Sequence, residues 1–196
     1  MARELDAAAL DLLFLEARAC SDWSDRPVPE ALLRRLYDIL KYGSTTANSL
    51  PARFLFLTSE GAKQRIAPAL DSTNRPKSMK APVITVIAYD LRFYETLLVT
   101  FPHKPMARSW YEGKPDLDRT ALRNSALQGA YLMMAARALG LDCGPMSGFN
   151  EKMVNDDFFA DGRYRVNFLC ALGYGVPQPP APRLPRLPFE TACQIL

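Results

Sequence analysis

Three hydroxyl side chains and one asparagine fall within five consecutive positions, Ser44-Thr45-Thr46-Ala47-Asn48. Such a run is unsuited to a protein core, because a buried hydroxyl or amide group costs free energy unless it is hydrogen-bonded. Its side chains, together with the free backbone N–H groups of a turn, suit a ligand that carries several hydroxyl groups and a phosphate. An ordinary polar turn is the alternative that this segment, taken alone, leaves open.

The polar segment is expected to connect an amphipathic helix to an apolar strand. Leucines 33, 36 and 40 recur at helical spacing before it, and Gly43 is suited to end a helix. The β-branched, apolar sequence at 82–89 predicts a central strand. The expected helices cover residues 6–20, 29–42, 60–70, 118–139 and 150–159, and the expected strands cover 53–58, 82–89 and 166–174. Helices mixed with a few separated strands predict one layered domain of the α+β or α/β class.

Two further segments have unusual composition. Residues 93–115 are aromatic and irregular, and we interpret them as a candidate lid. Residues 176–188 contain six prolines, so this part of the tail must be extended. The tail could be unstructured, could be a ligand for an SH3-like domain, or could be an arm that wraps a partner subunit. We favour the arm over residues 176–196, because the last eight residues are mixed apolar and polar and suggest order.

Composition excludes several classes of protein. The chain has 196 residues, 48% of them hydrophobic, which is enough for one globular domain with a core. A net charge of +3, spread evenly, does not indicate nucleic-acid binding. No apolar run reaches the roughly 18 residues of a membrane span, and the start has no apolar signal core. We therefore expect a cytoplasmic protein. The scattered cysteines are expected to be reduced thiols, namely Cys20, Cys143, Cys170 and Cys193.

Common catalytic and nucleotide-binding motifs are missing from the sequence. It contains neither G-x-G-x-x-G nor G-x-x-x-x-G-K-[ST], so neither a Rossmann-type fold nor a P-loop is supported. His103 is the one histidine, and a loop histidine is more often a polar surface residue than a catalyst. Neither a metal site nor a paired-carboxylate site is predicted. Any redox chemistry would therefore have to come from a cofactor.

Several segments, in their order along the chain, resemble those of the nitroreductase superfamily of FMN enzymes. They are Trp23 with Pro27-Val28-Pro29, Ser44-Thr45-Thr46-x-Asn48-x-x-Pro51, Asn74-Arg75-Pro76-Lys77, and Gly140-Leu141 with Pro145-x-x-Gly148-Phe149. Arg18 and the tail sequence Arg183-Leu184-Pro185-Arg186 complete the pattern. The resemblance covers nearly the whole chain and is fairly specific in combination.

Within that superfamily the chain is most similar to the malonic semialdehyde reductases of the Rut pyrimidine-degradation pathway. The similarity rests on Phe101-Pro102-His103, Ala107-Arg108-Ser109-Trp110, Arg123-Asn124-Ser125, Gly144 to Phe149, and Arg183 to Leu187. It implies reduction of malonic semialdehyde to 3-hydroxypropionate by ping-pong hydride transfer from NADH or NADPH through FMN. A broader FMN reductase of nitro compounds, quinones or enones is the first alternative. A flavin-free interaction module that uses the proline-rich tail is the second.

The resemblance also implies a fold and an assembly. It predicts one α+β domain over residues 1–196, with three layers and a central, mostly antiparallel sheet flanked by helices. It further implies an intertwined homodimer with two FMN sites at the interface.

The resemblance assigns roles to individual residues. The phosphate side of FMN would be held by Arg18, Arg183 and Arg186, with the choice between the last two open. The partner subunit would supply Ser44, Thr45, Thr46 and Asn48, which would meet the ribityl chain and the phosphate of FMN. The pyrimidine edge of the flavin would meet Asn74 and Lys77, with Lys80 as an alternative to Lys77. The segment Pro145, Met146, Ser147 and Gly148 would lie near flavin N5, and Arg108 is a candidate clamp for a substrate carboxylate.

Overall fold

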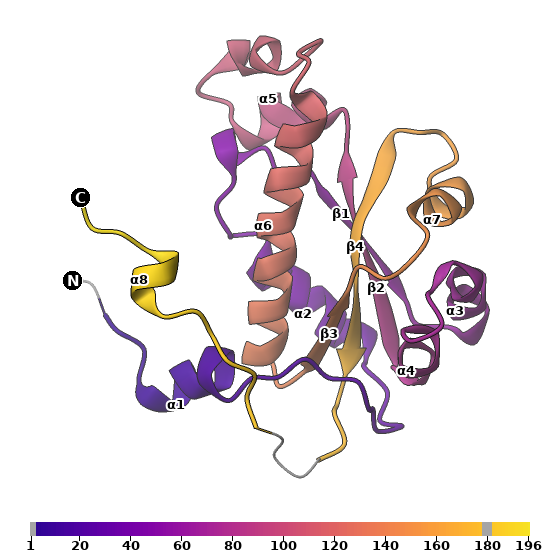
Figure 1. The fold of residues 1–196 in the computed structure, drawn as a ribbon. Coiled ribbons are helices and arrows are strands. Elements are labelled where there is room, and N and C mark those ends of the chain that lie inside the picture. The colour runs from indigo at the N-terminus through magenta and orange to yellow at the C-terminus, as the bar shows by residue number, and fades with distance from the viewer. Residues whose placement is uncertain (1–2, 178–181) are drawn as a thin grey trace.

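A four-stranded antiparallel sheet forms the centre of the molecule (Figure 1). The computed structural model describes residues 3–177 and 182–196. The strands stand in the order β1 (Ala52–Leu57), β2 (Val83–Asp90), β4 (Tyr164–Gly173) and β3 (Asp142–Met146). Every pairing between neighbours is antiparallel. The predicted α+β class with a mostly antiparallel central sheet is confirmed.

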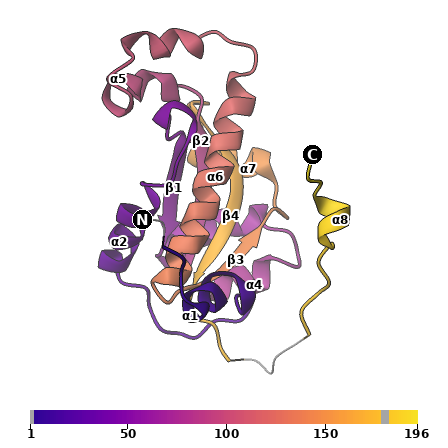
Figure 2. The same ribbon diagram turned by 90° about the vertical axis from the view of Figure 1, so that its left-hand side faces the viewer.

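Helices cover both faces of the sheet, which gives the three predicted layers (Figures 1 and 2). One face carries α2 (Glu30–Leu40) and the long helix α6 (Leu117–Ala138). The other carries α3 (Glu60–Ile66), the 3-10 turn η3 (Ala67–Ala69), α4 (Arg75–Lys80) and α7 (Glu151–Phe158). Among the described residues, no helix is long and apolar enough to cross a membrane.

The core lies in two clusters, one on each face of the sheet. Leu36 and Leu132 pack with Ile87 on the α2–α6 face. Ile66 and Val154 pack with neighbours such as Leu169 on the other face. Strand β2 is buried along its whole length, because its alternate side chains enter both clusters. This explains why its sequence is mostly apolar on both faces.

Strand β3 was not predicted as a strand. Its sequence, Asp142 to Met146, contains a glycine and a proline, and both are unfavourable inside a strand. Pro145 is tolerated because β3 is an outer strand of the sheet, where a missing N–H need not break a ladder. Helix α4 was also missed, because its short sequence has no clear apolar periodicity.

The first predicted helix, over residues 6–20, is wrong over its last five residues. The chain forms α1 (Ala7–Leu10) and one π-helical turn, η1 (Asp11–Leu15), and then leaves the helix. Cys20 N donates to the carbonyl of Cys143 at 2.8 Å, so this segment runs beside β3 instead. Arg18 therefore lies beyond a helix end and not within the last turn.

The candidate lid is more regular than its sequence suggests. It consists of η4 (Phe93–Thr96), α5 (Leu97–Thr100) and η5 (Pro105–Trp110), all of them short. Phe93 anchors it, because this ring is fully buried and packs edge-on against Tyr111 at 5.1 Å between centroids. Val99 and Met106, by contrast, are largely exposed.

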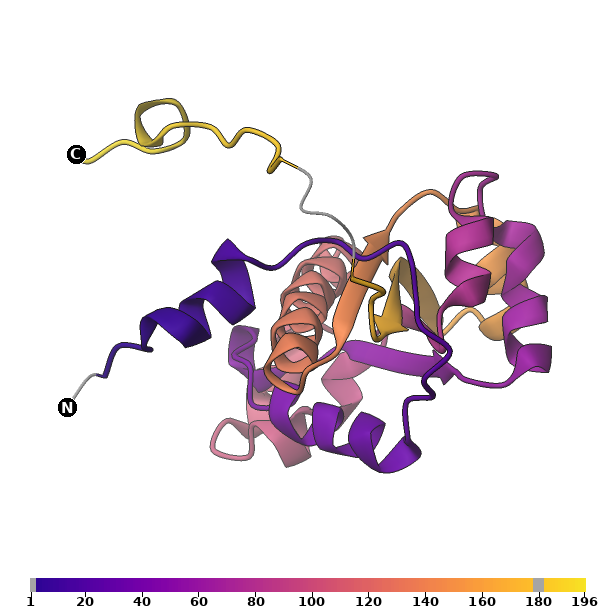
Figure 3. The ribbon, with the colours of Figure 1, turned by 90° about the horizontal axis from the view of Figure 1, so that it is seen from below.

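The tail leaves the body of the protein (Figure 3). Its residues 182–188 form neither helix nor strand, and the short helix α8 (Phe189–Ala192) follows, which was not predicted. Part of the segment expected to be extended, residues 178–181, lies outside the described residues. Leu184, Leu187 and Phe189 are exposed, and so are Phe14 and Leu15 of η1.

Candidate functional site

A small cleft of about 80 Å³ opens where β3, α4 and the segment before Trp23 meet. It brings together Lys77, Pro145 and Met146, three of the predicted site residues. The other lining residues are Ala19, Cys20, Ser21, Trp23, Ser78, Gly144 and Ala171. Lys77 of α4 and the segment after α6 thus lie against each other.

Hydrogen bonds fix the walls of this cleft. Ser78 is fully buried, and its hydroxyl donates to Met146 Sδ at 3.1 Å. Asn74 Nδ2 donates to the carbonyl of Gly148 at 2.9 Å. A Cβ on Gly148 would lie 2.4 Å from that Nδ2 and 2.7 Å from Asp71 Oδ2. The absence of a side chain at Gly148 thus makes room for Asn74 and Asp71. Ser147 continues this turn, and its carbonyl accepts from the backbone N–H of Phe149.

Seven of the ten lining residues had no predicted role in ligand binding, and Cys20, Trp23 and Ser78 are among them. Trp23 is 5% exposed, and its indole Nε1 has no hydrogen-bond partner among the described residues. Burial raises the pKa of the Cys20 thiol, so the neutral thiol faces the cleft at neutral pH. The one sequence feature that could have indicated Cys20 and Trp23 as site residues is their position shortly after Arg18.

Two of the three predicted phosphate-binding arginines lie side by side. Arg18 Nη1 donates to the carbonyls of Leu15 and Ala17, both at 3.2 Å. Arg183 Nη2 donates to the same two carbonyls. Arg186 is separate, since its Nη1 donates to carbonyls within the tail, with the nearer one at 2.8 Å. The described part of the chain contains no carboxylate within ion-pair distance of Arg18 or Arg183, so their charges are available to an anion.

Segment Ser44–Asn48 is held by hydrogen bonds to distant elements. The Thr46 N–H donates to Asn124 Oδ1 at 2.8 Å, and Tyr131 Oη donates to the carbonyl of Ser44 at 2.9 Å. Asn48 Nδ2 donates to the carbonyl of Thr100 in the lid at 2.7 Å. Within the segment, the Leu50 N–H donates to Thr45 Oγ1.

Thr46 of the polar segment and the arginine pair lie beside different parts of α6. Thr46 contacts Asn124 near the start of this helix. Near its end, Arg137 donates to the carbonyl of Leu13, two residues before the carbonyl that Arg18 and Arg183 share. Thirteen residues at 1.5 Å each place positions 124 and 137 roughly 20 Å apart along the axis. Thr46 and the arginine pair therefore lie beside well-separated positions of α6 within one chain.

Arg108, the candidate carboxylate clamp, already has a partner. Its Nε and Nη2 donate to the two carboxylate oxygens of Glu112 at 2.9 and 2.6 Å, and its guanidinium lies over the ring of Tyr94. These hydrogen bonds lower the pKa of Glu112, which therefore stays charged at neutral pH. A substrate carboxylate would have to displace Glu112.

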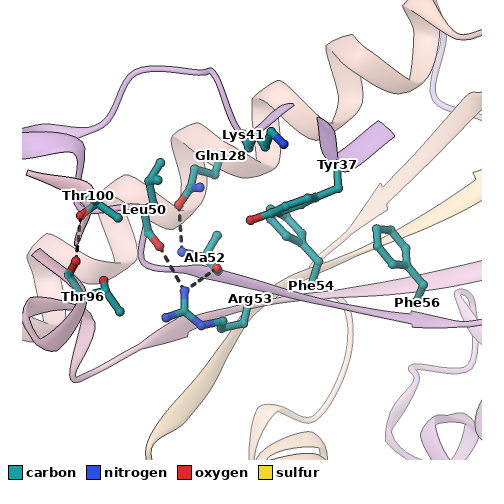
Figure 4. Close-up of a pocket in the computed structure, with 10 residues that line it drawn as sticks. All are labelled: Tyr37, Lys41, Leu50, Ala52, Arg53, Phe54, Phe56, Thr96, Thr100 and Gln128. Atoms are coloured by element: carbon teal, nitrogen blue, oxygen red, sulfur yellow. Dashed lines mark hydrogen bonds between the residues drawn. The ribbon is translucent and has the colours of Figure 1, made fainter. Parts of the chain in front are cut away.

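A larger cavity of about 470 Å³ lies elsewhere, along β1 (Figure 4). Its walls include Tyr37 and Lys41 from α2, Arg53 and Phe54 from β1, and Gln128 from α6. It contains none of the predicted site residues. It adjoins the chain that follows segment Ser44–Asn48, because Leu50 and Ala52 also line it.

Residues 15–174 match the family model described as "Nitroreductase family". The chain belongs to the nitroreductase family. A protein of Ralstonia nicotianae named "Putative NADH dehydrogenase/NAD(P)H nitroreductase RSc1004" is 52% identical over 193 residues, which cover 98% of each chain. The matched residues include those that line the small cleft between β3 and α4.

Solved structures show the same nitroreductase fold. The crystal structure of a "putative nitroreductase in complex with FMN" from Exiguobacterium sibiricum matches with a TM-score of 0.81 and 20% identity, covering 94% of this chain and 96% of that one. CLA-ER, an enone reductase of gut-bacterial fatty acid metabolism, matches with a TM-score of 0.82 and 18% identity, covering 98% and 100%. At such identities the likeness concerns the fold alone.

Proposed function

We propose that this nitroreductase-family chain is an FMN-dependent NAD(P)H oxidoreductase that acts as a homodimer. The observation that carries the proposal is the cleft between Lys77 and Met146, in a chain whose Arg18 and Arg183 lie side by side with no carboxylate partner among the described residues. A related protein is named as an NAD(P)H nitroreductase, and a protein of the same fold was crystallised with FMN.

The residues present suit FMN. Guanidinium groups bind phosphate through paired, charge-assisted hydrogen bonds, and Arg18 and Arg183 would do so together. Lys77 would place an ammonium at the pyrimidine edge of the flavin, beside Asn74. Trp23 offers an unpartnered indole N–H at the cleft wall. The chemistry that bound FMN supplies is hydride transfer, from NAD(P)H to an acceptor, in two half-reactions at one pocket.

One chain holds only part of such a site. A cleft of about 80 Å³ is well below the roughly 300–1,000 Å³ of typical ligand pockets. Thr46 contacts α6 at Asn124, which is well separated along the helix from Arg137, the residue that contacts the chain before Arg18. A homodimer resolves both points, because a second copy can bring its own Ser44–Asn48 to the cleft. The exposed apolar residues of η1 and of the tail are the surfaces that such a dimer would cover.

For the acceptor we propose malonic semialdehyde, reduced to 3-hydroxypropionate in pyrimidine degradation. The support is the resemblance of the lid and the segment Gly144 to Phe149 to that subfamily. Arg108 is the residue that would bind the acceptor's carboxylate after displacing Glu112. A broader preference for nitro compounds, quinones or enones is the alternative, and the names of the related proteins favour it.

The cofactor is tested first, with the purified full chain. A flavin absorption spectrum, either as isolated or after reconstitution with FMN, is the expected result. A colourless protein that cannot be reconstituted would contradict the proposal and favour the flavin-free interaction module.

The acceptor is tested anaerobically. Bound FMN is reduced with NADH or NADPH, and its reoxidation rate is compared for malonic semialdehyde, a quinone, a nitroarene and an enone. Fastest reoxidation by malonic semialdehyde supports the specific proposal. If the aldehyde reacts no faster than buffer while quinones or nitroarenes react readily, the broader reductase is the correct function.

The dimer is tested by removing residues 182–196, which include Arg183 and the exposed tail. The truncated chain should be monomeric on sedimentation and should lose FMN. Arg183→Ala in the full-length chain is the matched control, since it removes the phosphate ligand and leaves the tail. It should weaken FMN binding and remain dimeric. A dimeric truncated chain would show that the tail is not the arm.

A further inference from the structure

One face of α6 holds the polar segment and the chain that follows it by three side chains. Asn124, Gln128 and Tyr131 stand at positions i, i+4 and i+7, so they line one side of the helix. We call these three residues the α6 polar face. Asn124 is 1% exposed and Gln128 is 3% exposed, which is unusual for amides. The sequence motif Arg123-Asn124-Ser125 was singled out above without a role.

Each member of the α6 polar face binds the backbone of the segment or of its flanks. Asn124 Oδ1 accepts from the Thr46 N–H, and Tyr131 Oη donates to the carbonyl of Ser44. Gln128 Oε1 accepts from the Ala52 N–H at 2.8 Å, as Figure 4 shows. The three hydrogen bonds thus span the chain from residue 44 to residue 52.

The backbone between these bonds needs external support. Ala47, Asn48 and Leu50 have φ values of 49°, 47° and 42°, a region that residues other than glycine seldom occupy. Such conformations cost of order 1–3 kcal/mol each and persist only where surrounding structure imposes them. The segment also fits closely on the helix, since a Cβ on Gly43 would lie 2.0 Å from the ring of Tyr131.

We infer that Asn124 is a positioning residue for ligand binding, acting through the Thr46 N–H to hold segment Ser44–Asn48 in its ligand-binding shape. This inference rests on the proposed function, because the ligand is the FMN of the second subunit. The amide cannot itself touch the ligand from its buried position. Its second group is also engaged, since Nδ2 donates to the carbonyl of Thr120 at 2.9 Å.

The hydrogen bond can be removed from the Thr46 side with little disturbance. Thr46→Pro deletes the N–H that Asn124 accepts. Thr46 is the first residue of the 3-10 turn η2 (Thr46–Asn48), a position where proline is tolerated. Thr45 precedes it with φ −135° and ψ 159°, which is the extended conformation that proline requires of its neighbour. Thr46→Ala is the matched control, because it removes the same side chain and keeps the N–H.

The experiment is a double-mutant cycle on the full-length protein with FMN as the probe. Equilibrium dissociation constants are measured for Thr46→Ala and Thr46→Pro, each with Asn124 intact and with Asn124→Ala. With Asn124 intact, proline should weaken FMN binding about tenfold relative to alanine, because the buried Oδ1 loses its donor. With Asn124→Ala, the two variants should agree within about twofold.

A purely structural role for Asn124 predicts a different pattern. Ser125→Ala serves as the control, since Ser125 is fully buried on the same helix but donates to Ala88 in β2. It should lower the melting temperature and leave the FMN dissociation constant unchanged. Equal weakening of FMN binding by Ser125→Ala and Asn124→Ala would overturn the inference, as would a proline effect that is the same in both Asn124 backgrounds. If the unmodified protein binds no FMN, the proposed function and this inference both fall.

Discussion

Asp90 joins two arginines at the end of β2, and removing its charge should destabilise the fold. The side chain is fully buried. Oδ2 accepts from Arg53 Nη2 at 2.7 Å and from Arg163 Nη2 at 3.0 Å, while Oδ1 accepts from Arg163 Nε at 3.1 Å and from the Arg92 N–H at 2.8 Å. Arg163 also pairs with Glu95 in the lid at 3.1 Å. The carboxylate therefore ties the start of β1 and the first turn of the lid to the central strand.

Asp90→Asn keeps the shape of the side chain and removes its charge. An asparagine can still accept through Oδ1, but its Nδ2 would face two guanidinium donors. Two charge-assisted hydrogen bonds of roughly 1.5–3 kcal/mol each are then lost. The side chains of Arg53 and Arg163 are 33% and 28% exposed, so water can replace part of this interaction. We expect the free energy of unfolding to fall by about 2–3 kcal/mol.

The assay is urea unfolding at fixed protein and FMN concentration, with Asp157→Asn as the control. Asp157 accepts from Arg65 through both carboxylate oxygens, but this pair is about half exposed. Its loss should cost less than about 1 kcal/mol. Equal shifts of the two unfolding midpoints would refute the reasoning that burial decides the strength of these ion pairs.

Three further predictions concern the site. Cys20 should be alkylated more slowly than the exposed Cys193 at neutral pH, because burial raises the Cys20 pKa. The alkylation rate of Cys20, measured by peptide mass spectrometry, should rise with pH and fall when FMN is added. Lys77→Met should lower the reduction potential of bound flavin by on the order of 30 mV, and Lys80→Met should leave that potential unchanged. A lower potential in Lys80→Met alone would identify Lys80 as the flavin partner. Arg108→Ala should raise KM for a carboxylated aldehyde and not for a quinone, whereas Glu112→Gln should lower the first KM by freeing Arg108. Equal effects on both substrates would exclude the clamp.

Regular elements with strong patterns could be predicted from the sequence. Helix 118–139 and strand 82–89 were each displaced by one residue from their observed bounds. Their signals are local, because apolar spacing and β-branched content act within the segment itself. Strand β3 gave no such signal, since Gly144 and Pro145 are permitted there only by its place at the outer side of the sheet.

The sequence could name candidate site residues, but it could not predict how these residues are arranged in space. The resemblance named Lys77, Pro145 and Met146 from the family's chain order, and the structure places all three around one cleft. It left Arg183 and Arg186 undecided, and the structure shows that only Arg183 shares its acceptors with Arg18. No local sequence pattern decides between Arg183 and Arg186, because the choice depends on tertiary contacts between the extended tail and distant carbonyls.

The separation of the two halves of the site leads to a test that needs no mutation. Thr46 and Arg18 would have to approach one phosphate within hydrogen-bond distance, about 3 Å, yet the helix positions beside them lie roughly 20 Å apart. If both bind the same FMN, they belong to different subunits, and binding of FMN is then linked to dimerisation. The fraction of protein carrying FMN should therefore fall on dilution at constant free FMN, in step with the appearance of monomer in sedimentation. A monomer that retains FMN as tightly as the dimer would show that segment Ser44–Asn48 is not part of the site.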